Sequence, residues 1–125
     1  MRQVSILNNT HPLRTPLTAG YCDRFLCRLR GLMLRSQLPT DRGLVLVENA
    51  ESRLNAGIHM LGMAFDLGIV WLDNNRQVVD IQKARRWRSF LIPRIAARYV
   101  IEFHAKRLEE FHLGDQIVFE ETHPA

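Results

Sequence analysis

Residues 67–81, LGIVWLDNNRQVVDI, decide the fold of this chain. They hold two apolar runs, residues 67–72 and 77–81, and the polar turn between them, residues 73–75. The first run is short and rich in β-branched and aromatic side chains, as expected for a buried strand. Asp and Asn side chains favour the turn that follows. The pattern predicts a β-hairpin in which Trp71 faces Val78 or Val79 on the second strand.

The rest of the chain also alternates between short apolar runs and turns, which predicts mainly strands. Further strands are expected at residues 3–7, 44–47, 58–63, 98–103 and 116–120. Two segments have apolar residues at helical spacing and predict short helices, residues 21–31 and 105–112. We therefore expect an α+β fold: a mainly antiparallel, curled or barrel-like β-sheet with one or two short helices. The short connections argue against parallel crossovers.

The composition fits a single domain, residues 1–125. The chain has 125 residues, 46% of them hydrophobic and 24% charged, and a chain of this size can fold without a metal or a disulfide. Cys22 and Cys27, about 140° apart on the expected helix, are interpreted as reduced thiols. Residues 1–9 lack the core of a signal peptide and no apolar run is long enough to span a membrane, so a cytoplasmic location is expected.

Much of the net charge of +4 comes from one segment, residues 83–94. Its five cations surround Trp87 and Phe90, and they are Lys83, Arg85, Arg86, Arg88 and Arg94. Cations can neutralise phosphates while an aromatic ring stacks on a base or another flat group. The segment is interpreted either as a long basic loop that binds an anionic small molecule or nucleic acid, or as a solvated loop whose Trp87 packs on the core.

A second candidate segment lies around the start of the strand expected at residues 58–63. His59 has apolar neighbours, where it is either a hydrogen-bonded structural group or a general acid or base. Arg53 and Asn55, in the loop before it, either bind a carboxylate or phosphate with His59 or satisfy loop carbonyls. The candidate ligand-binding residues are therefore Arg53, Asn55, His59, Arg85, Arg86, Trp87 and Arg88.

No metal site or cofactor is expected. Glu102 and His104 lie two residues apart and form either an acid–imidazole pair or two metal ligands, but a structural metal needs about four ligands. The other histidines are scattered along the chain, at His11, His112 and His123. Residues 57–62 have the glycine spacing of a phosphate-binding loop without the Lys and the hydroxyl that should follow.

The order of four motifs resembles the DUF192 family, an uncharacterised domain of bacteria and archaea. The motifs are RLRGLM at 28–33, GIHM at 57–60, IVWLD at 69–73 and ARYVIE at 97–102. The resemblance implies a compact β-rich domain, found alone or behind an export signal, whose role is not established. Many members have Met-x-Phe-Pro-Ile-Asp-Val before the hydrophobic strand, whereas this chain has MAFDLGI at 63–69. The acid thus lies two positions early and the proline is absent.

We expect a small non-catalytic binding module that binds an anionic ligand or partner through the basic Arg/Trp loop. The alternative is an enzyme that acts on a small anionic substrate, with His59 as acid or base and Arg53 or Arg86 holding the charge. A third alternative is a structural or assembly protein that buries the apolar residues of the basic loop in a homodimer. These alternatives differ in whether a pocket reaches His59 and in whether residues 51–57 and 83–94 converge.

Overall fold

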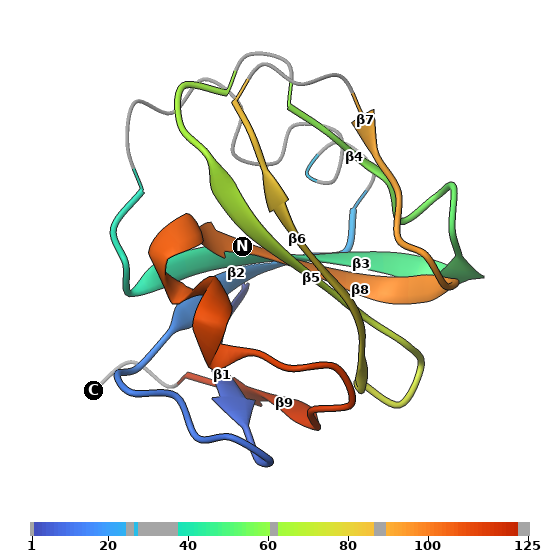
Figure 1. Ribbon diagram of the computed structural model, residues 1–125. Helices are drawn as coiled ribbons and strands as arrows, with labels where there is room; N and C mark the ends of the chain where they lie inside the picture. The colour runs from blue at the N-terminus through green and yellow to red at the C-terminus, as the bar shows by residue number, and fades with distance from the viewer. Residues whose placement is uncertain (1, 25–26, 28–37, 61–62, 87–89, 123–125) are drawn as a thin grey trace.

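The computed structural model describes residues 2–24, 27, 38–60, 63–86 and 90–122, and over these residues the chain is rich in β-structure (Figure 1). The strands are β1 (Arg2–Asn8), β2 (Thr18–Cys22), β3 (Arg42–Ser52), β4 (Ile58–His59), β5 (Leu67–Leu72), β6 (Val78–Ala84), β7 (Phe90–Leu91), β8 (Ala97–His104) and β9 (Ile117–Glu121). The 3₁₀ helix η1 (Ala105–Glu110) stands where a helix over residues 105–112 is expected.

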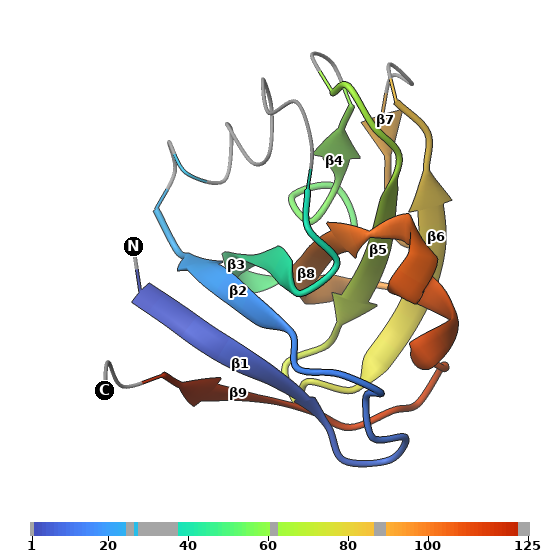
Figure 2. The same cartoon turned by 90° about the vertical axis from the view of Figure 1, so that its left-hand side faces the viewer.

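Seven of these strands form one sheet in the order β6-β5-β8-β3-β2-β1-β9, and β4 pairs with β7 in a separate ladder. Strand β8 lies between β3 and β5 and is antiparallel to both. The sheet is strongly twisted, so that β5 and β6 stand nearly upright in Figure 2 while β1, β2 and β9 cross obliquely below them. This arrangement confirms a β-rich, mainly antiparallel fold.

The sheet is not closed into a barrel. Its edge strands, β6 and β9, approach each other at the isolated bridge between Gln77 and Gln116. Backbone hydrogen bonds flank this bridge, from Val78 N to Asp115 O at 2.9 Å and from Ile117 N to Arg76 O at 2.9 Å. The expectation of a curled or barrel-like sheet is therefore only partly confirmed.

The hairpin predicted from residues 67–81 is confirmed, with β5 and β6 paired in antiparallel register. The expected neighbour of Trp71 is wrong, because Trp71 lies opposite Asp80 while Leu72 lies opposite Val78. The register shifts between these two pairs, so that Val79 has no opposite residue on β5. A bulge of this kind adds one residue to one strand and cannot be seen in an alternating pattern.

The expectation against parallel crossovers is wrong at one place, because β2 runs parallel to β3, with Thr18 opposite Arg42 and Cys22 opposite Leu46. A parallel pair needs a connection of a dozen residues or more. Residues 23–41 supply that length, so the short connections elsewhere in the chain do not limit this pair.

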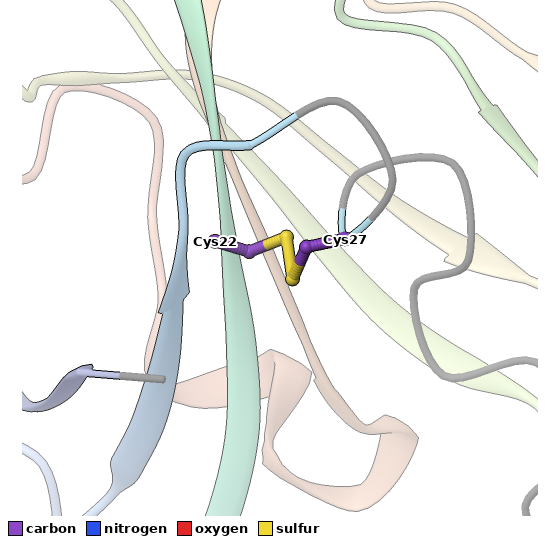
Figure 3. Close-up of a disulfide and its surroundings, with 2 residues drawn as sticks. All are labelled: Cys22 and Cys27. Carbon is purple, nitrogen blue, oxygen red and sulfur yellow. A yellow bond between two sulfur atoms is a disulfide. The ribbon is translucent and has the colours of Figure 1, made fainter.

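The interpretation of Cys22 and Cys27 as reduced thiols is also wrong, because the structure joins them in a disulfide (Figure 3). The spacing argument placed both residues on one helix, whereas Cys22 is the last residue of β2. Their Cα atoms lie 5.7 Å apart, within the usual range for a disulfide. The rest of the helix expected over residues 21–31 lies mostly outside the described residues.

Two other elements differ in extent from the expectation. The strand expected over residues 58–63 is limited to Ile58 and His59. The segment 83–94 is not a continuous loop, since Lys83 and Ala84 end β6 and residues 90–91 form β7. The basic segment is thus held at both ends by β-structure.

The two faces of the sheet bury two separate apolar cores. Along β8, Val100 belongs to one core, whereas Tyr99, Ile101 and Phe103 belong to the other. The same alternation divides β5, where Ile69 and Trp71 join Val100 while Val70 and Leu72 join Ile101. Both faces of the central strands are therefore covered, which explains their nearly continuous apolar sequences.

Opening the disulfide should lower the stability of the domain. Reduction, or the substitution Cys27→Ser, removes a cross-link over a short loop and is expected to cost about 2 kcal/mol of unfolding free energy. Urea denaturation with and without a phosphine reductant measures this difference, and Cys27→Ser should be insensitive to the reductant. Equal stability in both conditions contradicts a disulfide in the folded protein.

The cytoplasmic location stays a prediction. Disulfides are uncommon in reducing compartments, so thiol trapping in whole cells, which reports whether Cys22 and Cys27 are reduced or oxidised there, would test this location.

Candidate functional site

The two segments singled out in the sequence, residues 51–57 and 83–94, converge in the structure. Strands β4 and β7 pair with His59 opposite Phe90, and both lie at the top of Figure 1. The Nε atom of Arg53 donates to the carbonyl of Pro93 at 3.0 Å. The side chain of Arg53 therefore joins the two segments, and its Nε is already engaged by the Pro93 carbonyl.

A buried tryptophan fixes the first segment against the sheet. Trp71 in β5 is fully buried, and its Nε1 donates to the carbonyl of Ala56, also fully buried, at 2.8 Å. A tight turn precedes this contact, with Gly57 N donating to Leu54 O at 3.0 Å. The loop is thus anchored one residue from Asn55 and three residues from His59.

Phe90 packs directly on Gly57. A Cβ atom at position 57 would overlap Phe90 Cζ, so the close approach of ring and backbone requires glycine there. The Phe90 side chain remains half exposed, at 51%. Its ring therefore lies over the turn with much of its surface available to a ligand.

A groove of about 500 Å³ lies between the end of β3 and the β4–β7 ladder. Leu46 and Val100 line it on the side of the sheet, Phe90 on the side of the ladder. The polar and charged side chains that line it are Glu48, Asn49, Glu51, Ser52, Asn55 and His59. A groove of this size can hold a small molecule, and it brings the candidates Asn55 and His59 together.

The arginines named in the sequence analysis that the structure describes lie outside this groove. Arg85 and Arg86 are exposed just after β6, and Arg86 N donates to Asp66 Oδ1 at 2.9 Å. Neither they nor Arg53 line the groove. The predicted site residues Trp87 and Arg88 lie outside the described residues.

Sequence reasoning missed Asp80, a buried carboxylate that organises the second segment. Asp80 accepts from Arg94 N at 2.9 Å and from Gln82 Nε2 at 2.9 Å, and its Oδ1 lies 3.5 Å from Arg94 Nε. Gln82 Nε2 also donates to Ile92 O at 3.1 Å. The sequence did contain a signal for this role of Asp80: an acidic residue within an apolar strand, followed by a basic segment.

Exposed apolar side chains gather on the same two segments and on the residue that follows the second one. They are Leu54, Phe90, Ile92 and Ile95, with exposed fractions between 37% and 70%. Exposed apolar surface beside a groove is typical of a binding site. The convergence of residues 51–57 and 83–94 therefore presents both polar and apolar contacts to a ligand.

Glu102 is a buried carboxyl group on the sheet face that also carries Val100. It lies opposite Leu44 on β3 and Ile69 on β5 and is only 5% exposed. Burial raises the pKa of Glu102 from 4.5 to about 7, because a charge is poorly solvated there. The acid–imidazole pair considered for Glu102 and His104 does not form, since no hydrogen bond joins these two described residues and His104 Nδ1 accepts from Lys106 N at 3.1 Å.

A buried arginine, Arg107, was also missed by the sequence reasoning. Its guanidinium donates to the carbonyls of Thr15 at 2.6 Å, Pro16 at 3.0 Å and Thr40 at 3.0 Å. It also pairs with Glu110 at 2.9 Å, and this hydrogen bond lowers the pKa of the Glu110 carboxyl. These partners occupy the guanidinium, so Arg107 ties η1 to two loops rather than binding a ligand.

Two of the histidines that are scattered along the sequence meet in the structure. His11 and His112 are 101 positions apart in the sequence, yet their ring centroids lie 4.2 Å apart. Both rings approach the buried carboxylate of Asp115. His123 lies outside the described residues.

This curled β domain, with its groove between β3 and the β4–β7 ladder, matches a family whose members have no established function. The family model of DUF192, described as "Uncharacterized ACR", matches residues 6–119. The chain therefore belongs to the DUF192 family, and the resemblance seen in its motifs is confirmed.

Similar proteins in archaea carry the description "UPF0127 protein". A "UPF0127 protein" of Thermococcus gammatolerans is 50% identical over 80 residues, which cover 64% of this chain and 50% of the relative. A "UPF0127 protein" of Pyrococcus abyssi is 30% identical over 114 residues, which cover 90% of this chain and 94% of the relative. The chain spans about half the length of the first of these relatives.

Two solved structures have the same fold. One, from Sinorhizobium meliloti 1021, is described as "a putative transcription regulator" and superposes with a TM-score of 0.81 at 18% identity, covering 94% of this chain and 92% of that one. The other, a protein of unknown function from Novosphingobium aromaticivorans, gives a TM-score of 0.75 at 20% identity over 93% and 83% of the two chains. At these identities the likeness extends to the fold alone. Over the described residues, no helix is long and apolar enough to cross a membrane.

The buried carboxyl of Glu102 predicts a distinctive dependence of stability on pH. The folded state retains a proton up to about pH 7, whereas the unfolded state releases it near the ordinary Glu value. The unfolding free energy should therefore fall as the pH rises from about 5 to 8, by on the order of 3 kcal/mol. Urea denaturation across this range measures the effect.

The variant Glu102→Gln should lose this pH dependence and should be more stable than the parent chain at pH 8. The exposed Glu120 offers a matched control, and Glu120→Gln should keep the parent profile. A Glu102→Gln profile that runs parallel to that of the parent chain contradicts the assignment.

Proposed function

We propose that the protein is a small binding module whose ligand lies in the groove between β3 and the β4–β7 ladder. The ligand is anionic and carries a flat ring, as a nucleotide or the end of a nucleic-acid strand does. The observation that carries this proposal is the convergence of residues 51–57 and 83–94 on one groove. Two segments far apart in the sequence are held together there by a β-ladder and by the Arg53 contact with Pro93.

The lining of the groove suits a ring with hydrogen-bonding groups. The half-exposed ring of Phe90 offers a surface for stacking, a contact that is worth about 1–3 kcal/mol per base and tolerates any base. Asn55 offers an amide. Glu48 and Glu51 line the same groove, and Glu51, whose Oε2 already accepts from Asn74 N at 2.7 Å, offers its other carboxylate oxygen to an amino or hydroxyl group. These carboxylates also make the groove itself a poor place for a phosphate.

The anionic part of the ligand would instead bind the exposed guanidinium groups of Arg85 and Arg86. Strands β6, β4 and β7 reach the same end of the domain in Figures 1 and 2, and Arg85 and Arg86 follow β6 without an ion pair that occupies their guanidinium groups among the described residues. Exposed guanidinium groups bind phosphates in a salt-dependent manner. Binding should therefore weaken as the ionic strength rises.

An enzyme with His59 as acid or base is the second candidate, because the groove does reach His59 and two carboxylates line it. His59 as a residue is partly exposed, with its Nδ1 atom buried. Proton transfer by His59 does not require a neighbouring nucleophile, but it does require a bound substrate.

Titration of the ¹⁵N-labelled chain with AMP, inorganic phosphate, a single-stranded ten-residue oligonucleotide and its duplex tests the binding proposal. We expect amide shifts confined to residues 52–59 and 85–95, with AMP or the single strand binding more tightly than phosphate. The double variant Arg85→Gln/Arg86→Gln should bind about tenfold more weakly at low salt, since two charged contacts are lost. A nucleic-acid ligand should also give a linear fall of log K with log salt.

The control removes the same charge elsewhere. Arg42, at the start of β3, and Lys106, on η1, are exposed and do not line the groove, so Arg42→Gln/Lys106→Gln should keep the parent affinity. Equal weakening in both double variants, or shifts spread over the whole surface, would mean that only general electrostatic attraction operates. Absence of any shift at low salt removes the proposal.

The variant His59→Gln separates the two candidate functions. A binding module should retain its affinity within about fivefold, because one uncharged polar contact contributes about 1 kcal/mol. An enzyme should instead lose turnover of the bound nucleotide by a factor of about 10²–10⁴. Turnover is followed by chromatography of the nucleotide after prolonged incubation, and unchanged turnover in His59→Gln excludes His59 as the acid or base.

A further inference from the structure

Two histidines and an aspartate from separate parts of the chain meet at the end of the domain opposite β4 and β7. His11 follows β1, His112 follows η1, and Asp115 precedes β9. The end of β1 and the start of β9 lie at the bottom of Figure 1, whereas β4 and β7 lie at the top. This cluster is therefore separate from the groove and from any ligand bound there.

The carboxylate of Asp115 is the fixed part of the cluster. Its side chain is only 1% exposed, and Oδ2 accepts from Asn8 Nδ2 at 2.7 Å and from His112 N at 2.8 Å. The carboxylate is held in place before any ion binds.

The supporting residue Asn8 is itself fixed. Its Oδ1 accepts from the backbone N–H groups of Thr10 at 3.1 Å and His11 at 2.9 Å, and the residue is buried. One side chain thus positions both the carboxylate and the backbone of His11. Support of this kind around ligand side chains is typical of metal sites.

Each of the two imidazoles approaches the Asp115 carboxylate with its Nδ1 atom. His11 Nδ1 lies 2.7 Å from Asp115 Oδ1, and His112 Nδ1 lies 3.6 Å from Asp115 Oδ2. One ligand atom from each of the three residues lies within 4.8 Å of the others. Both histidine side chains are about half exposed, so small rotations of the rings can bring these atoms to the separations found around a single ion.

We propose that His11, His112 and Asp115 bind a divalent transition-metal ion of the zinc class. The ion would replace the hydrogen bond between His11 Nδ1 and Asp115 Oδ1, and each imidazole would bind it through Nδ1 with its own proton on Nε2. Two imidazole nitrogens and one carboxylate oxygen suit zinc, cobalt or nickel rather than magnesium or calcium, which prefer oxygen ligands. Three protein ligands and the exposed position of the rings leave at least one coordination position for water.

The ion would also join three segments of the chain. It would connect the end of β1, the turn after η1 and the start of β9, where the two edges of the sheet approach. Because the folded state alone brings these ligands together, binding should raise the unfolding temperature.

Isothermal titration calorimetry of the untagged full chain with ZnCl₂ tests the proposal. The chain is first treated with EDTA and exchanged into buffer without reductant, so that Cys22 and Cys27 stay in their disulfide and offer no thiolate. We expect one ion per chain, an unfolding temperature that rises by several degrees, and, with CoCl₂, the visible absorption of four-coordinate cobalt. His11→Gln and His112→Gln should each weaken zinc binding at least tenfold.

The control is His104→Gln, which removes an imidazole outside the cluster and leaves an acceptor for Lys106 N. It should bind zinc as the parent chain does. Each variant is first compared with the parent chain by its amide spectrum without metal, and Asp115→Asn provides a further variant if one histidine variant fails to fold. Zinc binding that survives in His11→Gln/His112→Gln, binding lost equally in His104→Gln, or no binding by the parent chain overturns the proposal.

Discussion

The indole N–H of Trp71 needs a hydrogen-bond acceptor, because an unpaired donor at a fully buried position costs about 1–3 kcal/mol. Its acceptor, the carbonyl of Ala56 at 2.8 Å, belongs to the loop that leads into β4. The contact therefore couples the core of the β5–β6 hairpin to the position of Asn55 and His59. Loss of this one bond would release the loop, and with it the turn on which Phe90 packs.

Around this anchor, the fold depends on contacts between distant parts of the chain. Strand β8 pairs with β3 and β5, and its alternating side chains serve two cores. Glu102 is the exception in that strand, since it is a carboxyl group in a position that would otherwise favour an apolar side chain. Burial raises its pKa to about 7, so the apolar core holds it mainly in its neutral form below that pH.

The sequence predicted those features that depend on neighbouring residues. The hairpin, the bounds of β5 and the strand character of β8 follow from local apolar patterns and turn residues. The Cys22–Cys27 disulfide was missed because a strand end was mistaken for a helix start. The convergence of residues 51–57 with 83–94, and the contact between His11 and His112, could not be predicted, because contacts between distant parts of the chain leave no periodic signal in the sequence.

The first and last strands of the sheet lie side by side, with Val4 opposite Glu121 and Asn8 opposite Ile117. Arg2 and Glu121 form an ion pair of 3.2 Å at the outer end of this antiparallel pair, so the chain enters and leaves the domain at the same place. A force that pulls the two ends apart would therefore open the β1–β9 ladder one pair at a time, starting from Arg2, instead of loading all of its hydrogen bonds together. The domain would yield mechanically at this edge at low force, whatever its thermodynamic stability.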